Sequence, residues 1–229
     1  MIVTTPSQQL QNALDALDAA FAPLSESPIA VGGCGYCYAD ADLEALAGPA
    51  CLVPEKLIAS VAVESIDHWD QFAALYRRLT PQIVRLLVTG RLHVDHGLVA
   101  SRLLAAGWRD WPAPEQQALE RVWEAWWRST LHEHPGTGQV TEVLEAVSVS
   151  TGSLSPWLAV WADTRTEAAD QHLGAALDQW LTGRELPELR FGFYDELLVG
   201  TDLVGWLLTL DEGRIGAAQL FEIERVAYS

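Results

Sequence analysis

Apolar residues recur at helical spacing along most of the chain, and this periodicity constrains the fold more than any other feature of the sequence. Residues spaced by three and four positions line one face of an α-helix. The first such set predicts a helix near 7–21 and consists of Leu10, Leu14, Leu17 and Phe21. The nearest approach to strand alternation, LRFGFYDE, is too short to build a sheet. The sequence therefore predicts an all-α protein.

Capping residues, prolines and glycines divide the remaining pattern into separate helices. A Pro/Gly/Ser-rich stretch begins an irregular segment, 23–53, in which Asp40 is expected to cap a short helix that ends at Gly48. Further helices are expected to begin at Pro54, Asp67, Thr80-Pro81, Asp95 and Pro114, and to lie near 138–150, 156–162, 166–182, 202–210 and 214–227. Thr80-Pro81 has two interpretations, because it either begins a helix that reverses the chain or kinks one long helix over 69–89.

Short helices joined by Gly and Pro turns favour a single all-α domain over 1–229, built as stacked antiparallel helical hairpins in a HEAT-like array. A globular helical bundle is the alternative. TGRL and TGREL each follow an apolar helix, but two short matches set no repeat period. The ten tryptophans lie between Trp69 and Trp206, and their helical spacing predicts core positions rather than a ligand cage.

The excess of acidic residues limits the classes of molecule that the chain is expected to bind. Against 14 basic residues the chain has 31 acidic ones, for a net charge of −17, and such a chain repels phosphate backbones. The densest basic cluster, Arg77, Arg78 and Arg85, forms no stripe, so nucleic acid is not expected as a partner. The apolar run DLVGWLLTLD is far shorter than the roughly 20 residues of a membrane span. With three cysteines and no recognisable leader, the protein is expected to be cytoplasmic with reduced thiols.

The stretch GGCGYCYADADLEALAG at 32–48 holds the most specific chemistry in the sequence. One interpretation is a zinc site, because Cys34, Cys37 and Cys51 have knuckle-like spacing, although a fourth ligand is not evident. A second is dithiol redox chemistry, since CGYC resembles the active-site pair of thioredoxin-like proteins. The favoured interpretation is two small apolar side chains that pack in a glycine-rich turn.

Redox chemistry has little support from the surrounding sequence. A thioredoxin-like site needs a βαβ unit, and only Ile29, Ala30 and Val31 precede the cysteines as a candidate strand. The acidic residues of the following helix are expected to raise the pKa of the thiols rather than to lower it. These residues are Asp40, Asp42 and Glu44.

The histidines do not complete an obvious site. His68 is nearest in sequence, but the intervening helix of about 18 Å is expected to hold it at the opposite end from Cys51, which disfavours a site of three cysteines and His68. Neither HExxH nor the Glu-x-x-His pair of di-iron bundles is present. The other histidines, whose placement depends on Thr80-Pro81, are expected at helix ends or on the surface: His93, His96, His132 and His134.

Two features together resemble a known group. A cysteine pair before a short helix, followed by YRRLTPQIVRLL at 76–87, resembles a family of uncharacterised bacterial all-helical proteins with an N-terminal CxxC pair. The resemblance covers the first half of the chain. It implies helices and no particular reaction.

These observations favour a non-catalytic, cytoplasmic helical protein that presents a surface to another protein and needs no cofactor. The first alternative is a metal-dependent or small-molecule enzyme with a site at helix termini. The second is a structural zinc-binding CxxC protein. SVSTGSLS contains neither a nucleophile elbow nor a phosphate-binding loop, so no catalytic residue is assigned.

Overall fold

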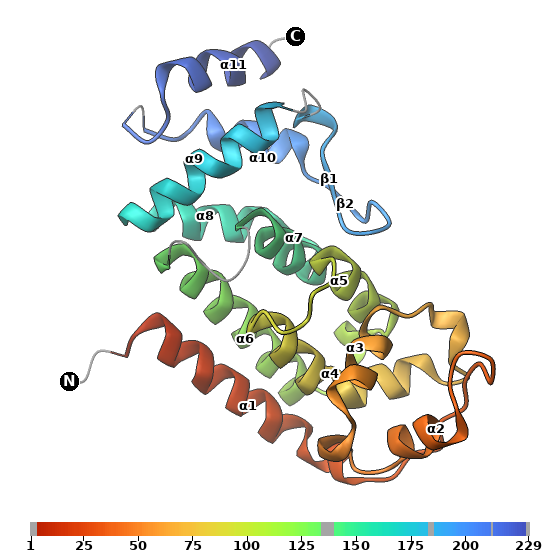
Figure 1. Ribbon diagram of the computed structural model, residues 1–229. Helices are drawn as coiled ribbons and strands as arrows, with labels where there is room; N and C mark the ends of the chain where they lie inside the picture. The colour runs from red at the N-terminus through yellow and green to blue at the C-terminus, as the bar shows by residue number, and fades with distance from the viewer. Residues whose placement is uncertain (1–3, 134–139, 183–185, 212, 228–229) are drawn as a thin grey trace. The chain divides into compact units, whose positions relative to one another are not determined.

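The computed structural model describes residues 4–133, 140–182, 186–211 and 213–227 (Figure 1). Within these ranges the regular structure consists of eleven α-helices, four short 3-10 turns and one two-stranded hairpin. The predicted all-α class is confirmed. None of the described helices has both the length and the apolar character that are needed to cross a bilayer.

The chain forms two compact units, Met1–Trp126 and Trp127–Ser229. The helices of the first unit are α1 (Pro6–Glu26), α2 (Asp40–Ala47), α3 (Glu55–Val63), α4 (Phe72–Val88), α5 (His96–Ala105) and the first part of α6 (Ala113–His132). Its 3-10 turns are η1 (Ala50–Leu52), η2 (Ile66–His68) and η3 (Trp108–Asp110).

Helix α4 lies at the centre of the first unit, where it packs against α1, α3 and α5 (Figure 1). It continues through Pro81, so of the two interpretations of Thr80-Pro81 the chain reversal is wrong and one long helix is confirmed. Proline removes a single backbone donor. Burial of most of α4 on three neighbouring helices outweighs that loss. The Thr80 hydroxyl also donates to the Tyr76 carbonyl at 2.9 Å.

Arg78 projects from α4 and caps the ends of two other helices. Its side chain is only 1% exposed. Nε donates to the carbonyl of Leu24 at 3.1 Å and Nη1 to that of Leu46 at 2.7 Å, and Nη2 donates to Ser25 and Gly48. Carbonyls in the last turn of a helix lack partners within the helix, so one guanidinium satisfies the C-terminal ends of α1 and α2.

This cap accounts for a difference at the end of the first helix. Pro23 was expected to begin the irregular segment, but α1 includes Pro23 and ends at Glu26. The carbonyls that follow Pro23 find their donors on Arg78, a residue far away in sequence. Local signals could not indicate this partner.

The other two arginines of the basic cluster have separate acidic partners. Arg77 forms a bidentate pair with Glu115 at 2.6 and 2.7 Å, while Arg85 contacts Asp15 and Asp18 on α1. The three guanidinium groups therefore serve different parts of the first unit and do not form a common basic surface.

The second unit contains the remaining elements. Its helices are α7 (Val140–Thr151), α8 (Ser155–Asp163), α9 (Glu167–Thr182), α10 (Gly200–Leu207) and α11 (Ala217–Ala227), with the turn η4 (Leu186–Glu188) and the strands β1 (Arg190–Phe191) and β2 (Leu197–Leu198). The two strands form a minimal antiparallel hairpin, with β1 inside the LRFGFYDE stretch and β2 directly after it. Helix α9 packs against α7 and α11.

Tryptophans build the core of the second unit. The Trp161 ring lies 5.4 Å from Trp127, 6.3 Å from Trp180 and 5.5 Å from Trp206, measured between centroids. Every tryptophan of the chain except Trp206 is buried. The prediction that their spacing marks core positions is confirmed.

Candidate metal centre

The segment that carries the cysteine pair lies alongside the connection between α3 and α4. Gly33 and Trp69 form an isolated antiparallel bridge. On either side of it the N–H of Cys34 donates to the His68 carbonyl at 2.9 Å, and the N–H of Asp70 donates to the Gly32 carbonyl at 3.0 Å. Hydrogen bonds of this kind set the register of two strands, so Cys34 is held beside His68.

Glycine makes this close approach feasible. A Cβ atom on Gly33 would lie 3.0 Å from the Trp69 ring and 3.1 Å from the His68 carbonyl oxygen. Both distances are shorter than an ordinary van der Waals contact between heavy atoms. The Gly-Gly pair before the first cysteine thus serves the pairing of two backbones.

A tight turn then brings Cys37 back toward Cys34. The backbone N–H groups of Cys37 and Tyr38 both donate to the Cys34 carbonyl, at 3.0 and 3.1 Å. Tyr38 anchors the far side of the turn, because its buried ring packs on Trp69 with centroids 4.4 Å apart. Its hydroxyl donates to Glu64, the residue that follows α3, at 3.1 Å.

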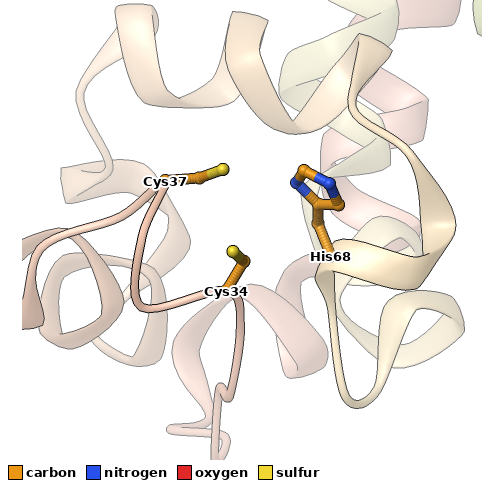
Figure 2. Close-up of side chains that lie close together, drawn as sticks. All are labelled: Cys34, Cys37 and His68. Carbon is orange, nitrogen blue, oxygen red and sulfur yellow. The ribbon is translucent and has the colours of Figure 1, made fainter.

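Cys34, Cys37 and His68 consequently converge on one point. Their sulfur and ring nitrogen atoms all lie within 4.8 Å of one another. Figure 2 shows both thiols and a nitrogen-bearing edge of the imidazole turned toward the same space. Cys34 and His68 are half-buried, while Cys37 is exposed, so the site lies at the surface of the first unit and is open to an ion from solvent.

The two thiols differ in acidity. Hydrogen bonding by the backbone of Tyr36 and Cys37 and by the Cys37 side chain holds the pKa of Cys34 below its ordinary value. The pKa of Cys37 is raised, first because its thiol donates to Cys34 and then by burial and by the negative charges of Cys34 and Glu64.

The predicted effect of the acidic residues on the thiols is therefore wrong for Cys34. Asp40, Asp42 and Glu44 are not among the groups that shift the pKa of either thiol. The carboxylate that acts on both comes from Glu64. Local backbone donors outweigh its influence at Cys34, because hydrogen bonds to the charged form of a group stabilise that form directly.

The imidazole of His68 has a nitrogen without a hydrogen-bond partner. Its Nδ1 lies 3.3 Å from Oε1 of Glu64, but the two atoms are not aligned as a hydrogen bond, and Nδ1 is buried with no other partner among the described residues. A buried polar atom of this kind calls for a specific explanation. A metal ion bound between the thiols and the ring would supply one.

Cys51, predicted as a third cysteine ligand, lies outside this group. It is exposed in η1, before α3 begins, whereas His68 comes after α3 has ended. Cys51 and His68 therefore lie at opposite ends of α3, as expected from the length of that helix. His68 still meets Cys34 and Cys37, because the long segment before α2 carries the first two cysteines to the other end of α3.

The remaining histidines do not join the site. The ring of His96 packs on Trp126 with centroids 5.6 Å apart, His93 is exposed, and Nδ1 of His132 lies 2.8 Å from the Arg128 carbonyl oxygen. His134 lies outside the described residues. Among the residues that the structure describes, Cys34, Cys37 and His68 form the only group of this kind.

His172 is a further histidine that sequence reasoning did not single out. It is buried on α9, where its Nε2 lies 2.8 Å from the Glu133 carbonyl oxygen. Its position on the apolar face of α9, beside Leu173, Ala176 and Leu177, was the available signal. This environment indicates a structural role in the second unit.

Two thiolates and an imidazole can supply three of the four ligands that zinc takes in proteins. The signal that could have paired His68 with the cysteines is the Gly-Gly dipeptide before Cys34, which marks a close backbone approach. Known proteins offer no further guide, because no protein-family model, no curated protein and no solved structure matches this chain.

Proposed function

We propose that Cys34, Cys37 and His68 bind a zinc ion with a structural role. The convergence of these three side chains on a hydrogen-bonded backbone frame carries the proposal. The ion would join the CxxC turn to the connection between α3 and α4. The protein would then belong to the class of structural zinc-binding CxxC proteins, which was one of the two alternatives to the interaction role.

The ligand chemistry favours zinc over harder cations. Thiolate sulfur and imidazole nitrogen suit zinc, whereas calcium and magnesium prefer oxygen ligands. Two thiolates on a tetrahedral zinc ion lie about 3.8 Å apart, since each Zn–S bond is about 2.3 Å long. The present separations, all within 4.8 Å, need only small side-chain rotations to reach that geometry.

A zinc ion at this site would add a side-chain link to a segment that is otherwise held mainly by one backbone bridge and by Tyr38. Residues 27–39 contain no helix, and the exposed face of the turn carries Tyr36, whose side chain is 98% exposed. Metal that binds only the folded state stabilises it by about 2.7 kcal/mol when free metal is about 100 times the Kd. Zinc would thus hold Tyr36 in one place, which is consistent with the predicted role in contacting another protein.

Metal analysis of protein that has been purified without chelator tests the proposal. We expect one zinc per chain, lost in Cys37→Ser and in His68→Ala. Cys51→Ser is the matched control, because Cys51 is an exposed cysteine outside the group, and it should keep the metal. Metal-free wild-type protein that takes up no zinc on titration, or equal zinc in all four proteins, would contradict the site.

The lowered pKa of Cys34 favours a second candidate, dithiol redox chemistry. In that reaction the Cys34 thiolate attacks a partner disulfide, and Cys37 then resolves the mixed disulfide, so that two electrons and two protons pass to the partner as it becomes two thiols. Metal-free protein with a Cys34–Cys37 disulfide that forms and breaks near cytosolic potentials would favour this candidate. One protected zinc per chain would reject it.

A further inference from the structure

We infer that Glu64 is the fourth ligand of this centre, so that the zinc ion is held by two cysteines, one histidine and one glutamate. The inference rests on the proposed zinc site. It assigns a residue that spacing alone does not reveal, since Glu64 is separated from the CxxC pair by the whole of α2 and α3.

The distance between Glu64 and His68 matches that arrangement. Their Oε1 and Nδ1 atoms are 3.3 Å apart. Oxygen and nitrogen ligands lie about 2.0–2.1 Å from zinc, and two such atoms on a tetrahedral ion are about 3.3–3.4 Å from each other. The observed pair therefore already has the length of one edge of the coordination tetrahedron.

The relative orientation of the Glu64 carboxylate and the His68 ring also supports a shared metal ion. At 3.3 Å the two atoms are close enough for a hydrogen bond, yet they are not aligned as one and Nδ1 has no partner among the described residues. Two ligand atoms that direct their lone pairs at a common cation have this relation, because neither points at the other. A cation between them would satisfy the buried nitrogen.

The carboxylate of Glu64 is itself held in place. The Tyr38 hydroxyl donates to Oε2 at 3.1 Å, and the N–H of Ser65 donates to Oε1 at 3.0 Å. The hydroxyl of Ser60 lies 3.1 Å from that of Tyr38. Metal-ligating carboxylates are commonly oriented by such hydrogen bonds. Since Tyr38 comes directly after Cys37, the turn that presents one ligand also orients another.

The negative charge of the Glu64 carboxylate also favours binding of a cation at this site. A coordinated thiol is deprotonated, so two metal-bound cysteines and the carboxylate would be three anionic groups, whose mutual repulsion a cation between them offsets. Glu64 lies outside the group whose atoms are all within 4.8 Å, and a divalent cation would draw its carboxylate toward the sulfur atoms. With Glu64 bound, all four positions are filled and none is left for water.

Cobalt(II) titration distinguishes a closed site from an open one. Cobalt replaces zinc as a coloured probe, and its visible spectrum reports the number and kind of ligands. We expect wild type to give a four-coordinate spectrum that added azide does not change. In Glu64→Ala the affinity for cobalt should fall by at least the roughly 10–100-fold that the loss of a residue orienting a metal ligand costs. The spectrum should respond to azide, and acetate should restore part of the affinity.

Two further variants control for indirect effects. Glu64→Gln keeps the shape of the side chain and should weaken binding in the same direction, which covers the case in which Glu64→Ala folds poorly. Glu55 is an exposed carboxylate at the start of α3, the helix that Glu64 follows, and it pairs with Arg91. Glu55→Gln should leave both affinity and spectrum unchanged.

The outcomes separate this inference from the proposed function. If wild type binds neither cobalt nor zinc, both fail. If wild type binds metal but its spectrum responds to azide, or if both Glu64 variants bind as tightly as wild type with the same spectrum, Glu64 is not a ligand. The centre formed by Cys34, Cys37 and His68 would then stand with an open fourth position.

Discussion

Replacing Arg78 by methionine should destabilise the first unit more than any other single change to a charged residue there. Arg78→Met keeps much of the aliphatic volume and removes all the donors that cap α1 and α2. The Leu46 carbonyl, bonded at 2.7 Å in a buried environment, loses its partner at a cost of about 1–3 kcal/mol. The carbonyls of Leu24, Ser25 and Gly48 are only partly buried, so water can replace some of their bonds, and together they add about 1 kcal/mol.

The expected loss is therefore about 2–4 kcal/mol, a large part of the roughly 5–15 kcal/mol that stabilises a typical protein. Urea denaturation followed by the helical signal in circular dichroism measures it. With a slope of about 2–3 kcal/mol per molar urea, the midpoint should fall by about 1 M. Arg91→Met is the matched control, because its side chain is 61% exposed and pairs with an exposed Glu55, and it should change stability by less than about 0.5 kcal/mol. Equal midpoints for the two variants would refute the capping role of Arg78.

Three other predictions concern Arg214, Tyr36 and the binding of nucleic acids. Arg214→Met should destabilise the second unit by about 2–3 kcal/mol in urea denaturation, because the Arg214 guanidinium donates to carbonyls of Trp161, Ala162 and Thr164 at the end of α8 and pairs with Asp170 at 2.6 Å; a change below about 0.5 kcal/mol would contradict this. Tyr36→Ser should leave the thermal midpoint and the zinc content unchanged, since the ring is 98% exposed, and a clear loss of either would show that the ring supports the turn. A net charge of −17 predicts negligible binding to DNA or RNA near physiological salt, which a salt-titrated shift in a gel at micromolar protein would overturn.

The sequence by itself determined the features that depend on neighbouring residues. Asp95 was predicted to begin a helix, and its carboxylate accepts the N–H of Leu98 at 2.9 Å. Gly107 follows the end of that helix, and it has the left-handed φ of 71° that glycine accommodates at such ends. Caps of this kind act within one turn, so local sequence suffices to predict them. The apolar spacing likewise predicted the all-α class and the buried tryptophans.

Only the tertiary structure decided the features that depend on residues far apart in the chain. Prolines at 23 and 81 lie inside helices because Arg78 caps the carbonyls that follow Pro23 at the end of α1, and because packing against neighbouring helices outweighs the backbone donor that α4 lacks at Pro81. The cysteine pair meets His68 because two irregular segments pair through a single backbone bridge at Gly33 and Trp69. Neither segment has a periodicity that could predict its partner. Long-range pairing of this kind is selected by the packing energy of the whole unit, which no local pattern encodes.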